Sequence, residues 1–565
     1  MLKGSLAERS KKTMNIFSGF SKVGHDYDSS KSEILKSIDE IQEGESQDDN
    51  FMFFRCGEHI KIYDRVCDHN GGKLSLREGV ASCPLHGWVL DLSNGLYTNA
   101  GCTKEPILEI NEYELDSPLI QIPITNSRLL TQSWSSVKRT EVRFINHACL
   151  IIKMGNITFA TDPWIHGSAF CNGWWLSDES PIDSFETLND CDFIYISHNH
   201  PDHLHPQSLK KIRNDMPILT GNFLSGSTKE YLHYLGFSKV VAMDFSSSLV
   251  NYEKEVMISV LKSGDFRDDS GLLFQHGNFK CLLTVDSNFL NFGKLPAVDL
   301  LCSSFAGGAS GFPLCFENYS EEEKKAVITR NRGAIKATNI SNIKIAKPRF
   351  FMPYAGFFTE SAERDRYIKE RNIKNGVDDF ESICNANEAL LLNVKKEQIF
   401  VFEGSQLVCS KRDETEKMDS STRGVISNLN AKEVDNKLKE VVINYFEGCD
   451  FKDKLLVDLR PTNDDFSSEN IGFILDFSSK HYSIFNCSSQ VGSIEDEAIS
   501  NGLRYLKIKV RREELLDVIT NGKPWEDLSI GFQCRIYRNP NLYNSEFWFY
   551  FTNKYVGCKI GSIPA

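Results

Sequence analysis

The sequence predicts an α+β protein built from several domains. A chain of 565 residues is too long for one hydrophobic core. Apolar residues at helical spacing predict a helix at 32–41. Short apolar runs separated by glycine-containing turns, at 51–54, 60–63, 89–92 and 107–110, then predict a small N-terminal antiparallel β-domain. Apolar strands that alternate with helices from residue 142 to residue 286 predict a central αββα domain. A further mixture of helix and strand after residue 433 predicts a C-terminal α/β domain.

The composition narrows the function classes and the compartment. The chain is 41% hydrophobic and 25% charged, with a net charge of −13, which argues against nucleic acid or an anionic membrane as the main partner. Sixteen cysteines are too dilute for a disulfide scaffold and fit reduced thiols. No secretory signal and no run of 18 apolar residues are visible. We therefore expect a cytoplasmic protein without a membrane span.

The first constellation is Cys-x-His followed, after thirteen residues, by Cys-x-x-His, formed by Cys67, His69, Cys83 and His86. Two thiolates and two imidazoles are the ligands of a Rieske [2Fe–2S] cluster, in which two histidines replace two cysteines on one iron. A Cys2His2 zinc site is the alternative. Zinc fingers usually pair cysteine with cysteine, whereas each half here carries one of each. The spacing therefore predicts an N-terminal antiparallel β Rieske domain.

The second constellation follows a buried strand at 193–197 and consists of His198, His200, Asp202 and His203. Side chains at the carboxyl end of a strand are where α/β sheets place their sites. The pattern matches the metallo-β-lactamase fold, in which the first two histidines serve one metal and the Asp-His pair serves another. Asp162 and Asp286, each ending a strand, stand where that fold gathers further acidic groups. A polar loop without metal is the alternative.

The histidines that follow the second constellation are few. After His205 only His233, His276 and His481 remain, and none is well placed to complete a dinuclear hydrolytic site. Asp265 stands where one further ligand is expected. Two histidines and a carboxylate are what a mononuclear non-haem iron needs, with open positions for O₂. We therefore expect one iron, held by the 198–203 loop with Asp265 or Asp286.

Three other features leave their alternatives open. The loop 305–313 is either a place where backbone N–H groups approach a phosphate or a plain tight loop. The basic run from Arg364 to Lys374 is either a solvated face or a nucleotide-phosphate clamp. Phe170 with Trp174 and Trp175 lines a substrate cleft or packs in the core.

Several long stretches resemble the CMP-N-acetylneuraminate hydroxylase family, in which a Rieske motif precedes a metallo-β-lactamase-like domain. They are DPWIHGSAFCNGWW (162–175), IYISHNHPDHL (194–204), FAGGASGFP (305–313), PYAGFFTES (353–361), YIKERNIKN (367–375) and WEDLSIGFQCRIYRNPNLY (525–543). The resemblance implies hydroxylation of the N-acetyl methyl of CMP-bound sialic acid to the N-glycolyl form. O₂ is consumed, and electrons arrive from NADH through cytochrome b5 and its reductase, or from a ferredoxin. It also implies that Cys67, His69, Cys83 and His86 are cluster ligands, and that the 198–203 loop is the catalytic one.

We expect a disordered tail at 1–30, the Rieske domain at 31–130, the metallo-β-lactamase-like domain at 136–410, a linker at 411–432 and the C-terminal domain at 433–565. The cluster is then the electron inlet, and the histidine-rich loop is the site of oxygen chemistry. One alternative is a metal-dependent hydrolase with the Rieske cluster as redox sensor. The other is a redox-responsive protein that binds a nucleotide sugar. Lys61, Arg65, Lys73 and Arg77 either form a basic surface for an acidic donor or are ordinary surface charge.

Overall fold

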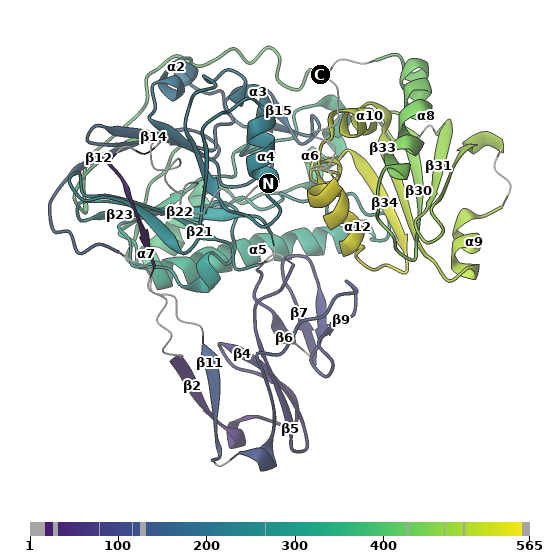
Figure 1. Cartoon of the computed structure of the whole chain (residues 1–565), viewed down its shortest axis with the longest axis horizontal. Helices are drawn as coiled ribbons and strands as arrows, with labels where there is room; N and C mark the ends of the chain where they lie inside the picture. Colours follow the sequence, from purple (N-terminus) through teal and green to yellow (C-terminus); the bar gives the residue numbers. More distant parts are fainter. Residues whose placement is uncertain are drawn as a thin grey trace, which may run out of the picture.

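The computed structural model describes residues 17, 19–25, 32–69, 71–77, 79–115, 117–124, 131–265, 267–426, 429–467, 469–489 and 492–555. Three bodies are visible in Figure 1: a narrow lobe of short strands at the bottom, a large central body, and a body at the right that contains the C-terminal strands and helices. This confirms the predicted α+β multidomain class. In the described residues, no helix is both long enough and apolar enough to cross a membrane.

The lobe at the bottom is built from small antiparallel sheets, as the short apolar runs predict. One sheet has the order β10-β5-β4-β3 and comprises Gly44–Gln47 (β3), Phe51–Cys56 (β4), His59–Asp64 (β5) and Leu108–Asn111 (β10). The other has the order β6-β7-β8-β9 and comprises Ser75–Arg77 (β6), Val80–Ser82 (β7), Val89–Asp91 (β8) and Leu96–Tyr97 (β9). The second sheet connects the two Cys/His loops.

Two expectations for the N-terminal region are wrong. Apolar residues at helical spacing predict a helix at 32–41, but Ser32–Ser37 forms strand β2, which pairs with Leu119–Ile124 (β11). Pairing with a distant strand overrides the local helical spacing. The expected tail at 1–30 is also partly ordered, because Ser21–Gly24 (β1) pairs with Ser247–Asn251 (β20) of the central body. The rest of that tail, apart from residues 17, 19, 20 and 25, lies outside the described residues.

The central body is an αββα sandwich. Its two eight-stranded sheets share one apolar core, to which both contribute fully buried side chains such as Phe159 and Phe274. The first sheet, β1-β20-β21-β22-β23-β24-β25-β27, adds Val256–Lys262 (β21), Ser270–His276 (β22), Phe279–Leu283 (β23), Leu300–Ser303 (β24), Phe350–Pro353 (β25) and Leu390–Leu391 (β27). The second, β19-β18-β17-β14-β13-β12-β28-β29, comprises Val240–Met243 (β19), Ile218–Gly221 (β18), Phe193–Tyr195 (β17), Ile157–Thr161 (β14), Cys149–Met154 (β13), Arg139–Asn146 (β12), Ile399–Glu403 (β28) and Gln406–Lys411 (β29).

Helices cover the outer faces of the sandwich. The second sheet packs against Ser184–Asn189 (α2), Pro206–Leu209 (α3) and Ser227–Tyr234 (α4) through a separate apolar cluster. The first is covered by Glu321–Ala346 (α5) and Glu381–Ala386 (α7). The long α5 runs between the central body and the lobe at the bottom of Figure 1, and its Ala334 and Ile335 pack against the apolar core of that lobe. Arg366–Arg371 (α6) faces the C-terminal body. A small sheet, β15-β16-β26, comprises Ser168–Ala169, Trp174–Leu176 and Phe358–Thr359.

The C-terminal body is a five-stranded sheet flanked by helices, with the strand order β32-β31-β30-β33-β34. The strands are Leu455–Thr462 (β30), Ile471–Asp476 (β31), His481–Asn486 (β32), Arg504–Arg511 (β33) and Cys534–Asn539 (β34). The helices are Ala431–Glu447 (α8), Ile494–Ser500 (α9), Arg512–Asn521 (α10), Glu526–Ile530 (α11) and Ser545–Phe549 (α12), and a π-helix follows at Tyr550–Lys554. This confirms the predicted α/β character.

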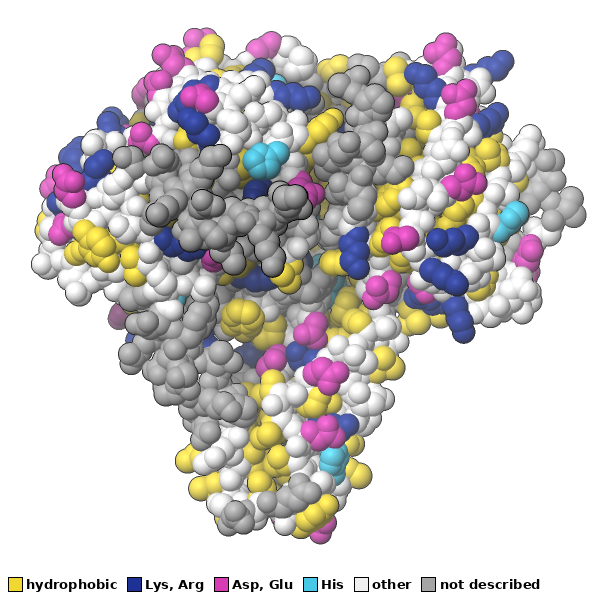
Figure 2. Space-filling model, viewed as in Figure 1, with side chains coloured by type: hydrophobic (Ala, Val, Ile, Leu, Met, Phe, Trp, Pro, Cys, Tyr) yellow, Lys and Arg dark blue, Asp and Glu magenta, His cyan; other side chains and the backbone are white. Residues whose placement is uncertain are grey.

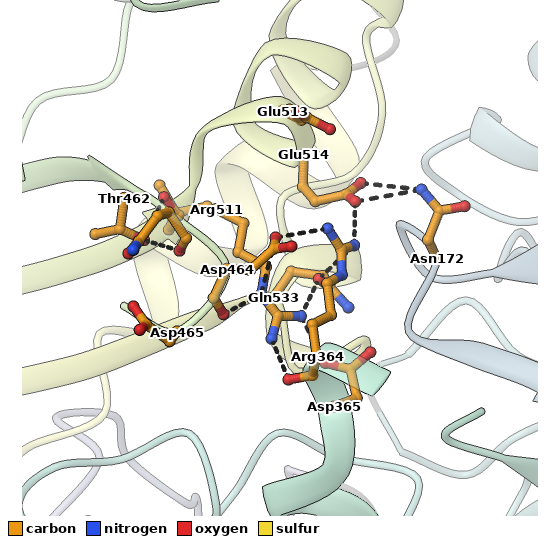
Figure 3. Close-up of polar contacts among 12 residues, drawn as sticks. Asn172, Arg364, Asp365, Thr462, Asp464, Asp465, Arg511, Glu513, Glu514 and Gln533 are labelled. Carbon is orange, nitrogen blue, oxygen red and sulfur yellow. Dashed lines mark hydrogen bonds and ion pairs between the residues drawn. The ribbon is translucent and has the colours of Figure 1, made fainter. Parts of the chain in front are cut away.

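A buried polar network joins the C-terminal body to the central body (Figure 3). Arg364 binds Glu514 of α10, and both side chains are at most 7% exposed. Arg511 donates to Asp365 at 2.5 Å, and the side chain of Gln533 accepts from both arginines. Such contacts fix the relative position of the two bodies, because a buried charge that loses its partner is costly.

The predicted linker begins against the central domain. Arg143 donates to the carboxylate of Asp413 at 2.7 Å, and the Met418 N–H donates to the Ser180 carbonyl at 2.9 Å. The domain limits themselves stay predictions.

Candidate functional site

Two short loops hold the predicted cluster ligands. In the first, the Cys67 N–H donates to the Gly72 carbonyl (2.8 Å) and the Gly71 N–H donates to the Cys67 carbonyl (3.0 Å). In the second, the Cys83 N–H donates to the Trp88 carbonyl at 2.7 Å. Both cysteines are buried, at 0% and 2% exposure. The two hydrogen-bonded turns place the cysteine thiols side by side, where they interact directly.

The imidazoles of the same two loops complete the ligand set. The ring centroids of His69 and His86 lie 4.5 Å apart, and the indole of Trp88 stacks on His69 at 4.6 Å. Burial lowers the pKa of His86 to about 4, and burial also lowers the pKa of His69 well below its usual range. Neutral imidazoles are the form that binds a metal. His86 Nδ1 is buried and has no hydrogen-bond partner among the described residues, as expected of an atom that ligates iron.

Glycine is required beside these ligands. A Cβ on Gly72 would lie 2.7 Å from the Sγ of Cys83, so a side chain there would occupy the space next to the thiolate. Gly71 has φ +62°, and a Cβ there would lie 2.8 Å from the Cβ of Phe289 in the central domain. The residues present therefore fit a [2Fe–2S] cluster, and the loop that holds it touches the central domain.

The histidine-rich loop contributes to a first buried group of metal-binding side chains. His147 Nε2 lies 3.2 Å from the Asp202 carboxylate, and His203 Nε2 lies 3.5 Å from it. None of these three side chains is more than 3% exposed. The Nε2 atoms of His147 and His203 have no hydrogen-bond partner in the described residues. Buried polar atoms that meet without hydrogen bonds indicate a site shaped for an ion.

A second group lies beside the first and consists of His198, His200 and Asp286. His198 Nε2 and His200 Nδ1 are 2.9 Å apart, and the donor atoms of the group all lie within 4.8 Å of one another. Asp286 also approaches His203 Nε2, at 3.5 Å, so it lies between the two groups. An ion bound at about 2.0–2.2 Å separates its ligand atoms by about 3.0–3.5 Å. The contacts of 3.2 and 3.5 Å in the first group and of 2.9 Å in the second are close to this spacing, so either group could hold a metal ion after small adjustments of its other side chains.

Electrostatics support the same interpretation. Burial opposes ionisation of Asp202, but the neighbouring imidazoles outweigh it and hold the pKa of that carboxyl well below its usual range. Burial, with the adjacent imidazoles of His203 and His200, holds the pKa of His198 far below its ordinary value. Asp202 is thus ionised and His198 neutral, as metal binding requires, whereas the carboxylates of Asp202, Asp286 and Asp162 raise the pKa of His203 above its usual value despite its burial. His203 would therefore release a proton when an ion binds.

The structure places a donor that the histidine count misses. The missing histidine lies upstream of the loop, because the hairpin between β12 and β13 carries His147 to the carboxyl end of β17. Its backbone is left-handed, with φ +44°, which is unusual for a residue other than glycine. The only sequence signal is a histidine that directly follows a strand, in Asn146-His147.

The remaining acidic residues have other partners. Asp162 accepts from the Ser197 N–H at 2.8 Å and contacts His203 Nδ1 at 3.0 Å, which orients the imidazole from behind. Asp265 is in neither donor group; it accepts from the guanidinium of Arg267 at 3.0 Å. His205 is also no part of the groups, since it bonds Ser208 and the Ser168 carbonyl.

Arg267 connects the two centres. Its guanidinium contacts the carboxylate of Asp265 at 3.0 Å and that of Asp269 at 3.6 Å. Asp265 lies against the Rieske loop, where a Cβ on Gly71 would be 3.3 Å from its carboxylate. Asp269 lies 3.4 Å from His198 Nδ1, and burial raises the pKa of its carboxyl to about 8. One chain of contacts therefore leads from the cluster loop to the second centre.

Both centres line the same cavity, which has a volume of about 760 Å³. The predicted cluster ligands His69 and His86 form part of its wall, as do His147, His198 and Asp202. Other walls come from the 304–313 loop, from α5 and from the C-terminal segment 543–554. Phe170 and Trp174 are buried and also line the cavity, with ring centroids 4.4 Å apart. They therefore pack in the core and form part of the cavity wall.

Two family models match the parts of this chain that contain the predicted cluster ligands and the histidine-rich loop. The Rieske [2Fe-2S] domain model matches residues 27–114, and a beta-lactamase superfamily domain model matches residues 141–264. Cytidine monophosphate-N-acetylneuraminic acid hydroxylase of Xenopus laevis is 29% identical over 89% of this chain and 89% of its own length. The mouse protein of that name is 29% identical over 89% and 91%. Among solved structures, the diiron β-hydroxylase CmlA from Streptomyces venezuelae matches 61% of this chain and 69% of its own at 15% identity, with a TM-score of 0.32.

The predicted Rieske centre and the predicted metallo-β-lactamase-like domain are thus present in one chain. Over 89% of its length this chain resembles the cytidine monophosphate-N-acetylneuraminic acid hydroxylases.

Proposed function

We propose that this chain is a monooxygenase that hydroxylates the N-acetyl methyl group of CMP-N-acetylneuraminate. The observation that carries the proposal is the single cavity lined by both the Rieske histidines and the second donor set. The similarity to named hydroxylases over nearly the whole chain supplies the substrate. The balanced reaction takes one O₂, two electrons and two protons, and it yields the CH₂OH product and one water.

The residues divide this task between them. Cys67, His69, Cys83 and His86 would hold the cluster. The non-haem iron would be held by donors from the two groups that contain His198, His200, Asp202, His203 and Asp286, joined by His147. When bound, the cluster supplies single electrons and the iron supplies the chemistry with O₂. Asp265 is also expected as an iron ligand, but it instead binds Arg267 and contributes to the contact between the centres.

The cavity wall keeps the reacting methyl group away from water. The rings of Trp174 and Phe358 stack at 3.7 Å, and Phe170 packs against Trp174 at 4.4 Å. All three are nearly fully buried and line the cavity. A dry, shaped wall holds a C–H bond at a fixed place and prevents loss of reactive species to solvent.

Electrons would come from an acidic donor such as cytochrome b5 with its NADH-dependent reductase, or from a ferredoxin, and we place the reaction in the cytoplasm. Two of the four residues considered for a basic docking surface already have partners within the lobe. Lys61 contacts Glu109 at 3.7 Å, and Arg65 donates to the Leu74 and Asp48 carbonyls. Lys73 and Arg77 are exposed. On the face of this lobe that Figure 2 shows, acidic side chains are more evident than basic ones, which favours ordinary surface charge over a basic docking patch on that face.

A second candidate function is a metal-dependent hydrolase that carries a redox-sensing cluster. The observation in its favour is that two neighbouring donor groups are present, and two adjacent ions suit hydrolysis by metal-bound water. This candidate requires turnover without O₂ and with zinc or manganese at the second centre.

The test uses the purified protein with reduced donor, CMP-N-acetylneuraminate and ¹⁸O₂. We expect a product 18 mass units heavier than the substrate, which is the gain of one ¹⁸O atom, and we expect no product from Cys83→Ser or His200→Ala. His233→Ala, a change of an exposed histidine on α4, should retain activity. Oxygen-independent cleavage of the substrate would instead favour the hydrolase.

A further inference from the structure

The glycine-rich loop after β24 lines the same cavity as the metal-binding side chains. Residues 306–310 of this loop all belong to the cavity wall. We propose that the backbone amides of Gly307, Gly308, Ala309 and Ser310 form the seat for the phosphate of the nucleotide sugar. This assignment rests on the proposed function, and it names where the anionic part of that substrate binds.

The carbonyl side of the loop is tied to the protein. The Asn372 side chain donates to the Gly308 carbonyl at 3.0 Å. Asn375 donates from its side chain to the Phe305 carbonyl (3.1 Å) and from its backbone to the Ala306 carbonyl (2.7 Å). With these carbonyls fixed from one side, the loop is held in one conformation before any ligand arrives. A preformed site binds without the entropic cost of ordering a loop.

The amide side of the loop is available. In the described part of the chain, no N–H group of residues 307–310 donates to a protein acceptor. Ala309 is exposed, and the three other residues are partly exposed. Gly307 and Gly308 both have left-handed backbones, with φ +71° and +74°, and a Cβ on Gly308 would lie 2.5 Å from the Asn372 side chain. Successive free amides in such turns form a concave site for an anion.

Side chains near the cavity offer few alternatives for a phosphate. Three side chains of the basic run from Arg364 to Lys374 already form ion pairs within the protein. Arg364 binds Glu514, Arg371 binds Glu321 at 2.8 Å and Lys374 binds Glu360 at 2.8 Å. This favours a structural role over a phosphate clamp. Among the described lysines and arginines, only Arg267 and Lys554 line the cavity, and Arg267 is paired with Asp265. Lys554 lies over the ring of Phe549 at 5.6 Å. The backbone amides of the loop therefore carry phosphate recognition.

A charge placed on the exposed Ala309 tests the seat without changing the metal-binding groups. The pair Ala309→Asp and Ala309→Asn differs in charge but hardly in shape. The probes are CMP and cytidine, which differ only by the phosphate, and their affinities are measured by calorimetry with the full chain. We expect wild type to bind CMP at least about tenfold more tightly than cytidine. Ala309→Asp should lose this preference, whereas Ala309→Asn should keep it.

Two results would overturn the seat: equal affinities of wild type for CMP and cytidine, or equal loss of CMP affinity in both variants. Hydroxylation is measured separately on the same samples. A phosphate preference that depends on Ala309 without any hydroxylated product would refute the proposed function and leave the anion seat intact. Hydroxylation by wild type without a preference for CMP over cytidine would refute the anion seat and leave the proposed function intact.

Discussion

The two candidate metal centres differ in how the chain assembles them. The predicted Rieske ligands come from two loops within twenty residues, joined by one small sheet. The second centre draws its donors from the ends of β12, β17 and β23, which lie far apart in the sequence. Local spacing is therefore enough to predict the first set, whereas the second depends on how strands are ordered in two sheets. The comparison predicts that the first centre is self-contained and that the second depends on the wider fold.

Complete loss of one centre with retention of the other is the largest expected effect. Cys83→Ser should abolish the Rieske signal in the EPR spectrum of the reduced protein, because the cluster loses a thiolate ligand. Metal at the second centre should remain. Cys102→Ser is the matched control, since Cys102 packs against the same core but is no ligand, and it should keep the signal. A full cluster in Cys83→Ser would contradict the ligand assignment.

The buried polar network between the C-terminal body and the central body should contribute to the stability of the folded chain. Glu514→Ala removes the buried charged partner of Arg364, which keeps only the half-exposed Asp464 at 3.1 Å and the Gln533 side chain, and we expect a loss of up to about 3 kcal/mol in stability. Glu370→Ala removes an exposed partner of Arg366 and should cost at most about 1 kcal/mol. Thermal unfolding followed by circular dichroism compares the two. Similar shifts for both variants would mean that the bodies are not held together by this network.

Substitution of His147 should change the metal content of the second centre but not that of the Rieske centre. His147→Ala should weaken metal binding at the second centre by more than about tenfold, because one donor of the first group is lost. The Rieske iron should be unaffected. Iron and zinc are quantified by mass spectrometry after dialysis, with His233→Ala as the control. Unchanged metal content at the second centre would remove His147 from the ligand set.

Arg267 tests whether the centres are electrostatically linked. A cation near the cluster favours its reduced form, so Arg267→Gln should lower the reduction potential of the cluster by up to about 59 mV, a tenfold change for one electron. Arg267→Lys should retain most of the wild-type potential. Arg77→Gln removes an exposed charge from the N-terminal lobe that carries the cluster ligands, and it should leave the reduction potential of the cluster unchanged. Equal potentials in the glutamine and lysine variants would show that the charge of Arg267 has no part in this link.

The contrast also explains how much the sequence can predict. The Cys/His spacing identifies the Rieske site, and the strand before His198 places the histidine-rich loop at a sheet edge. Asp286 follows another strand, which predicts that it lies at the same edge, and in the structure it lies 3.5 Å from His203. His147 and the role of Arg267 could not be found in this way, because strand order brings them to the site and no local pattern marks them. The helix expected at 32–41 fails for the same reason, since β11 is remote in sequence.

The central claim is that both centres lie in one cavity of one chain. Relaxation of the Rieske EPR signal tests it directly, because a fast-relaxing paramagnetic ion nearby accelerates relaxation of the cluster spin. The reduced protein is compared with Fe²⁺ and with diamagnetic Zn²⁺ at the second centre, at a dilution where chains do not associate. We expect the Rieske signal to saturate at higher microwave power with Fe²⁺ than with Zn²⁺. Identical saturation with both ions, each shown to be bound, would place the centres far apart and contradict this structure of the site.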